Sequence, residues 1–263
     1  MAVKAAVIGA CGATLIHVLS WTLLAGHSAA ALVRDSSKLK KMLYSHGVSE
    51  ETVESHLTIV EGSSRDVKAV VNLLRNDPQL IFSGITSLPE FGYNPFRPIG
   101  MRDATITGDS ATAVIDALRE LKSTNSISNA PVFVPISSTG HGSQRDQPHL
   151  LIPLYMWLLP IAQAGTAALE KAVREAGTEV NSPLGGYIML RPPLLTHGPM
   201  KGTKSLRVGW IWEDDMYRIK DQEEHGVEIG YTVSRQDLAR WISEQLVTGD
   251  FQIWKGRCVN LTY

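Results

Sequence analysis

The fold is decided by residues 4–15, which read Lys4-Ala-Ala-Val-Ile-Gly9-Ala-Cys11-Gly12-Ala13-Thr14-Leu15. A short apolar strand runs into a glycine turn, and a helix is expected to follow from about residue 12 to residue 26. A second apolar strand at residues 29–34 completes a βαβ unit. Glycines let the backbone of such a turn approach a pyrophosphate, whose charge meets the N–H groups at the helix start. The stretch predicts a dinucleotide-binding domain, with cofactor contacts from Gly9, Cys11, Gly12, Ala13 and Thr14.

Arg34, which ends the second strand, indicates which dinucleotide is bound. An acid at this point accepts hydrogen bonds from the ribose 2′-hydroxyl of NAD, whereas an arginine accommodates the 2′-phosphate of NADP. Ser36, Ser37 and Lys38 follow within one turn and add hydroxyl groups and a second positive charge. The sequence therefore predicts NADP(H) as the cofactor. In the alternative interpretation, Arg34 and Lys38 only solvate a strand end and a helix start.

The composition excludes several classes of protein. The chain has 263 residues, 44% of them hydrophobic, so it can bury a full core within one domain spanning residues 1–263. Its 25 basic and 26 acidic residues form no basic block, which argues against a nucleic-acid partner. The longest apolar run, near residues 150–164, is interrupted by Pro153 and Pro160, so no membrane segment is expected. Cys11 and Cys258 lie at opposite ends of the chain without the spacing of zinc ligands, so no structural metal is expected. So few cysteines are typical of a reducing compartment, which predicts a cytoplasmic protein. The sequence leaves the oligomeric state open.

Apolar strands alternate with helical segments along most of the chain. Further strands are expected at residues 57–61, 80–84, 131–137 and 187–191. Helices are expected at residues 65–75, 109–122 and 237–247, and another helix is expected to end near residue 177. This alternation predicts an α/β fold, a Rossmann-type doubly wound parallel sheet. A long connection at residues 86–104 is typical of a functional loop. Residues 192–232, which include a β-like run at 206–212, are expected to form a small substrate-side lobe before a terminal apolar run at 251–254.

Seven short motifs, in this order and spacing, resemble the NmrA-like group of atypical short-chain dehydrogenase/reductases, in particular fungal NAD(P)-binding proteins of secondary metabolism. They lie at residues 9–14, 32–39, 137–140, 145–148, 153–159, 190–192 and 234–237. The chain departs from the pattern at two places. Leu15 replaces the usual third glycine, which should change how the helix packs on the strand. Thr166 stands where the resemblance implies a lysine, and Tyr155 is followed four residues later by Leu159 rather than by the lysine of classical members.

The segments that follow the strands form the expected ligand crevice. Cofactor contacts are predicted for Ser83, Gly84, Ser137 and Ser138. The predicted catalytic residues are His141 as a base, Arg145 as a fixed cation, Asp146 as a carboxylate and Tyr155 as a proton donor. Each also has a structural interpretation. His141 could be a solvated loop residue, Arg145 and Asp146 could form an ion pair that braces the loop, and Tyr155 could be a core aromatic residue.

The resemblance together with the missing lysine predicts a tailoring enzyme that acts on a hydrophobic secondary metabolite, such as an alkaloid. Lysine ordinarily lowers the pKa of the tyrosine, so ordinary carbonyl reduction should be impaired. A redox-neutral cyclase or isomerase is favoured, for example one that closes a ring in a Pictet–Spengler manner. The alternatives are an NADPH-dependent reductase of an iminium, enone or carbonyl group, and a non-catalytic NADP sensor.

Overall fold

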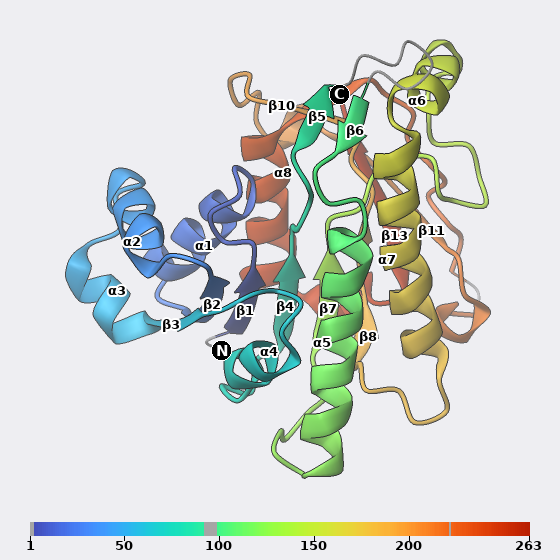
Figure 1. The fold of residues 1–263 in the computed structure, drawn as a ribbon. Helices are drawn as coiled ribbons and strands as arrows, with labels where there is room; N and C mark the ends of the chain where they lie inside the picture. The colour runs from blue at the N-terminus through green and yellow to red at the C-terminus, as the bar shows by residue number, and fades with distance from the viewer. Residues whose placement is uncertain (1–2, 92–98, 221) are drawn as a thin grey trace.

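A six-stranded parallel sheet forms the centre of the computed structural model, which describes residues 3–91, 99–220 and 222–263 (Figure 1). Its strand order is β3-β2-β1-β4-β7-β8. The strands are β1 (Lys4–Ile8), β2 (Ser28–Val33), β3 (Leu57–Glu61), β4 (Leu80–Ser83), β7 (Val132–Pro135) and β8 (Gly186–Tyr187). The order places β1 beside both β2 and β4, which is the switch point of a Rossmann sheet. The predicted fold class is confirmed.

Helices cover both faces of this sheet because successive side chains of a strand point to opposite sides. Ala5 and Val7 of β1 join the apolar cluster formed with α1 (Leu15–Leu24) and α8 (Arg235–Ile242). Ala6 and Ile8 join the second cluster, with α4 (Val67–Leu74), α5 (Ile106–Ser123) and α7 (Pro160–Thr178). The helices α2 (Ser36–Ser45) and α3 (Glu50–His56) connect β2 to β3. A π-helical turn, Ser243–Val247, continues α8 over the rest of its predicted length.

The predicted strand at residues 187–191 is divided in the structure. β8 stays in the main sheet, whereas β9 (Met189–Leu190) pairs with β13 (Arg257–Thr262), which also pairs with β11 (Arg207–Trp212). β13 was not predicted, because three of its six residues are polar although all six are buried. The predicted terminal apolar run at 251–254 forms a 3-10 turn, η5 (Phe251–Trp254).

Small elements lie beyond the carboxyl ends of the central strands. In Figure 1 they are at the top, past the arrowheads of β1 and β4. The predicted long connection contains the hairpin of β5 (Pro89–Phe91) and β6 (Ile99–Met101), whose residues 92–98 lie outside the described part of the chain. The others are β10 (Leu194–Thr196), β12 (Thr232–Ser234), η1 (His149–Leu151), α6 (Ile152–Leu158) and η2 (Thr203–Ser205). η3 (Asp215–Tyr217) lies instead near the end of α7, where the Tyr217 hydroxyl donates to the Gly177 carbonyl at 2.9 Å. β11 is an edge strand of the separate three-stranded sheet β11-β13-β9. A substrate-side role for residues 192–232 stays a prediction.

No single helix among the described residues is long and apolar enough to cross a membrane. Residues 149–158 and 160–178 pass that test only as a pair, across a bend of 97°. Pro153 and Pro160 stand in the first turns of α6 and α7, where a proline starts a new helix rather than continuing the previous one.

Candidate functional site

The glycine turn after β1 has the geometry that a dinucleotide requires. Gly9 has a φ angle of +88°, which favours glycine, and its carbonyl oxygen accepts a hydrogen bond from the Gly12 N–H at 2.8 Å. A Cβ atom on Gly12 would lie 3.0 Å from that same oxygen. Gly12 and Ala13 are exposed, and the side chain of Thr14, the N-cap of α1, makes no capping hydrogen bond. The start of α1 is therefore left open to an external anion such as a pyrophosphate.

Leu15 is accommodated by a glycine on the neighbouring strand. The Leu15 side chain is buried, and a Cβ atom on Gly84 would lie 2.8 Å from its Cδ1 atom. Gly84, just after β4, donates its N–H to the Ile8 carbonyl at 3.1 Å. A third glycine in the turn usually makes room for close packing of the helix on the strand. Here Gly84, which has no side chain, makes room for the Leu15 side chain instead. Ser83, a predicted cofactor contact, is itself 1% exposed, so its side chain belongs to the sheet interior.

The residues predicted to select the nucleotide lie together at the end of β2. Arg34, Ser37 and Lys38 are exposed, and neither cationic side chain has a hydrogen-bond or ion-pair partner within the described ranges. Both cations act on Cys11 in the turn: burial raises the pKa of that thiol, and the two positive charges oppose the rise. Ser36 is already engaged, because its N–H donates to Glu61 Oε1 at 2.9 Å. Arg34 and Lys38 therefore remain available to a phosphate.

A buried ion cluster supports the segment that follows β7. Arg191 is 1% exposed and donates to Glu170 through Nε and Nη2, at 3.0 and 2.7 Å, and to Glu213 through Nη1 at 2.8 Å. Burial alone would raise the pKa of Glu213, but the hydrogen bonds from Arg191 and Ser143 lower it. The Ser137 hydroxyl, predicted to contact the cofactor, donates instead to Glu170 Oε1 at 2.6 Å. We name Glu170, Arg191 and Glu213 the Arg191 cluster.

Asp146 braces the loop on which it lies. Its carboxylate accepts hydrogen bonds from the Gly140 N–H at 2.7 Å and from Asn260 Nδ2 of β13 at 3.2 Å. The side chain is 2% exposed, and this burial raises the pKa of Asp146. Asn260 belongs to a glycosylation-like triplet, residues 260–262, and its buried side chain fixes the loop to the neighbouring sheet. Arg145 is exposed, and its Nη1 donates to the Gln147 carbonyl rather than pairing with Asp146.

His141 is held by hydroxyl groups. Its Nε2 atom lies 2.6 Å from Thr166 Oγ1 on α7 and 3.4 Å from Ser138 Oγ. Burial lowers the pKa of His141, which favours the neutral ring near pH 7. The ring also lines a groove of about 350 Å³ beside Arg174. Thr166, at the position where the resemblance implies a lysine, thus hydrogen-bonds a histidine and supplies no charge.

Tyr155 on α6 neighbours the buried Thr139. Burial raises the pKa of the Tyr155 hydroxyl, and the nearby Thr139 hydroxyl lowers it to a smaller extent. Thr139 Oγ1 has no partner of good hydrogen-bond geometry in the described part of the chain, so we treat the two hydroxyls as neighbours rather than as a bonded pair. The Thr139 carbonyl accepts weakly from Gln163 Nε2 at 3.4 Å. Tyr155 and Gln163, which are half-buried, therefore form the polar part of the crevice that a substrate could reach, and Thr139 is buried beside Tyr155.

Two supporting groups of the site were not predicted. The Arg191 cluster includes Glu170 and Glu213, and the brace of Asp146 requires Asn260. Sequence carries only faint signals for them: Glu170 is an acid on the face of α7 that also carries Leu169 and Val173, and Asn260 interrupts an apolar strand.

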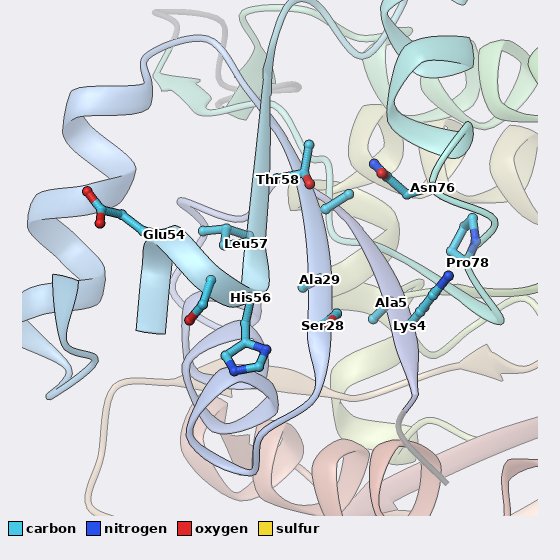
Figure 2. A pocket seen from close by; sticks show the side chains of 12 residues that line it. Lys4, Ala5, Ser28, Ala29, Glu54, His56, Leu57, Thr58, Asn76 and Pro78 are labelled. Atoms are coloured by element: carbon cyan, nitrogen blue, oxygen red, sulfur yellow. The ribbon is translucent and has the colours of Figure 1, made fainter. Parts of the chain in front are cut away.

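A pocket of about 170 Å³ lies at the opposite edge of the sheet (Figure 2). Its lining includes Lys4, Ser28 and Leu57, the first residues of β1, β2 and β3, together with His56 of α3. It contains none of the predicted site residues. The candidate site is therefore the crevice at the carboxyl ends of the strands.

Comparison with known proteins assigns the chain to a family. It is 33% identical to reductase pytE of Aspergillus terreus, over 98% of this chain and 97% of that protein. The chain belongs to the pytE family. It is also 28% identical to oxidase pynE of Aspergillus niger, again over 98% of this chain and 97% of the relative. Among solved structures, a Bacillus halodurans protein described as an NAD-dependent epimerase/dehydratase shares the fold of this pytE relative. The TM-score is 0.61 at 19% identity, covering 99% of this chain and 94% of that one. No family model matches the sequence.

Proposed function

We propose that the protein is an NADP(H)-dependent reductase of a hydrophobic secondary metabolite whose acceptor carbon is already activated, as in an iminium ion or a conjugated enone. The observation that carries this proposal is an intact dinucleotide turn combined with a Tyr155 hydroxyl whose pKa is raised and near which no lysine is described. The full-length likeness to a reductase and an oxidase supports oxidoreductase chemistry. Because of this similarity we favour a reductase over the redox-neutral reaction expected from the sequence alone. The seven sequence motifs support placement in the NmrA-like group.

NADP(H) is favoured over NAD(H) by two unpaired cations. Arg34 and Lys38 are exposed beside the glycine turn and have no internal partner in the described chain. A guanidinium can hold a 2′-phosphate in two charge-assisted hydrogen bonds, and an ammonium adds a point charge. The Bacillus halodurans protein is described as NAD-dependent, which supports a nicotinamide cofactor but not the choice of phosphate.

Exposed apolar side chains around the crevice support a hydrophobic substrate. Phe91 of β5 is 79% exposed, and on η1 and α6 Leu150 is 81% and Met156 is 74% exposed. These elements lie together at the top of Figure 1, beyond the carboxyl ends of the strands. Apolar surface gathered beside a polar crevice is typical of a ligand-binding rim.

The side chains of the site explain why an activated acceptor is preferred. A bound nicotinamide would supply the hydride. Reduction of a ketone leaves an alkoxide that needs a proton, and Tyr155, with its raised pKa, is a poor acid for that step. Reduction of an iminium leaves a neutral amine and requires no proton at all. Hydride addition to an enone leaves an enolate, which is a weaker base than an alkoxide and can take its proton from water. Tyr155 and Gln163 then act by orienting the substrate.

The proposal is tested by incubating the protein with NADPH and a panel of cyclic iminium ions, enones and ketones. We expect one NADPH oxidised per molecule of iminium or enone reduced, with ketones much slower. Tyr155→Phe should leave iminium reduction nearly unchanged and lower the already slow ketone reduction by less than the roughly 10²–10⁴-fold that the loss of an efficient proton donor costs. Thr124→Val, which removes an exposed hydroxyl at the end of α5, is the matched control. Fast ketone reduction that requires Tyr155 would contradict the proposal.

A redox-neutral cyclase or isomerase is the second candidate, and the same raised pKa of Tyr155 favours it. Oxidised and reduced cofactor would then both support turnover, and product would accumulate without a change in NADPH absorbance. Tight nucleotide binding without turnover of any compound would instead favour the non-catalytic sensor.

A further inference from the structure

Arg257, the first residue of β13, is buried without a partner for its charge. It is 5% exposed, its side chain makes no hydrogen bond or ion pair with the described residues, and its Nε atom is buried and unsatisfied. Burial lowers its pKa, and no carboxylate contributes to that shift. Arg191, the other deeply buried arginine described above, has two carboxylates instead. A buried charge is ordinarily paired, so the environment of Arg257 is incomplete.

Three tryptophans surround the Arg257 guanidinium. Its Cζ atom lies 3.6 Å from the ring centroid of Trp210, 5.5 Å from that of Trp212 and 5.4 Å from that of Trp254. Stacking of this kind stabilises the faces of a guanidinium but leaves the N–H groups at its edge without acceptors. The indole Nε1 atoms of Trp212 and Trp254 are likewise buried and unsatisfied.

Every unsatisfied polar atom in this cluster is therefore a hydrogen-bond donor. Arginine offers five N–H donors and each indole offers one, and none of these groups can accept. Water both donates and accepts, whereas an oxyanion only accepts and also neutralises the positive charge. The fork of a guanidinium matches two oxygens of a carboxylate or a phosphate.

We propose that Arg257, with the indole N–H groups of Trp212 and Trp254, forms a binding site for a small oxyanion, either a carboxylate or a phosphate. The Nε atom is sealed, but the Nη atoms are not among the buried unsatisfied atoms, so they hold the remaining surface of the residue and give the anion access. Arg257 pairs with Trp212 at the start of β13, at the amino edge of the sheet. The site is thus remote from the crevice and independent of the proposed function.

The six tryptophans of the chain allow a direct test by ¹⁵N–¹H spectroscopy of the indole groups. The full chain is titrated with acetate, inorganic phosphate or sulfate against sodium chloride at constant ionic strength. We expect the signals of Trp212 and Trp254, assigned from Trp→Phe variants, to shift saturably and the melting temperature to rise. Response to phosphate but not acetate would assign a phosphate ligand, and the converse a carboxylate.

Matched variants separate binding from stacking. Arg257→Met keeps a long side chain over Trp210 and should abolish the response, and Arg257→Lys should weaken binding at least tenfold. Arg240→Met, which removes an exposed arginine 5.9 Å from Trp21, should respond like the wild type. The proposal is overturned if the folded wild type shows no saturable shift, or if Arg257→Met responds equally.

Discussion

Arg34 is the residue on which the choice of nucleotide depends, and replacing it tests that choice. Arg34→Ala should weaken NADP(H) binding by about 1.5–3 kcal/mol, the range for hydrogen bonds to charged groups, and leave NAD(H) binding nearly unchanged. Dissociation constants from fluorescence titration with each nucleotide provide the measurement. Lys40→Ala, an exposed cation on the same helix α2, is the control and should have little effect. Equal losses for both nucleotides would contradict the assignment.

His141 should make the protein less stable in acid. Burial lowers its pKa in the folded state, so between that value and the unfolded value near 6.5 the unfolded chain binds more protons. The free energy of unfolding should therefore fall as the pH drops through this window. In urea unfolding between pH 7.5 and 5, His141→Asn should flatten the decline. His17, whose pKa burial also lowers, keeps part of the slope in the variant. An unchanged slope would refute the buried, neutral state of His141.

Between elements, the contact of α1 with β4 depends on Gly84. Its φ angle is not in the left-handed region, so Gly84→Ala adds only a Cβ atom, 2.8 Å from the buried Leu15. We expect a loss of about 1–3 kcal/mol from overpacking, and a loss in the double variant with Leu15→Ala that is smaller than the sum of the two single losses. Gly198→Ala, where the new atom would meet Thr196 at an ordinary 3.6 Å, is the control. Chemical denaturation of the wild type, the two single variants, the double variant and the control checks this, and additive losses in the double variant would exclude the contact.

Among the helices and strands, the sequence predicts those whose pattern of apolar and turn residues lies within the element itself. The strands β1, β2 and β4 are runs of buried apolar residues bounded by turns, so they are recognisable without knowledge of the tertiary structure. β13 is not, because Arg257 and Asn260 are polar and their burial is explained only by partners far along the chain. The catalytic candidates show the same limit. Residues 141–146 are adjacent in sequence, but which of them brace the loop is decided by Thr166 and Asn260.

In the whole molecule, the Arg191 cluster joins the ends of β9 and β11 to α7 through buried ion pairs. Arg191→Met leaves Glu170 and Glu213 buried without a counter-charge, and we expect a loss of about 3–5 kcal/mol. The triple variant Glu170→Leu, Arg191→Met, Glu213→Leu should recover much of this loss, since no charge then remains at these three positions. Arg119→Met, which breaks an exposed cluster with Asp116 and Glu179, should cost about 1 kcal/mol or less. Urea unfolding distinguishes these cases, and a triple variant no more stable than the single one would contradict the account.

The ion pairs between positions 170, 191 and 213 also limit which substitutions evolution can accept at these positions. Replacing Arg191 leaves two buried carboxylates without a counter-charge, whereas replacing one glutamate still leaves an arginine–glutamate pair, so the arginine can be lost without a destabilised intermediate only after or together with the acids. Relatives should therefore fall into two groups, one that keeps Arg191 with at least one of the two acids and one with none of the three charges. In the second group the residue corresponding to Ser137 loses the acceptor of its hydroxyl and is released to drift toward alanine or to serve the ligand directly.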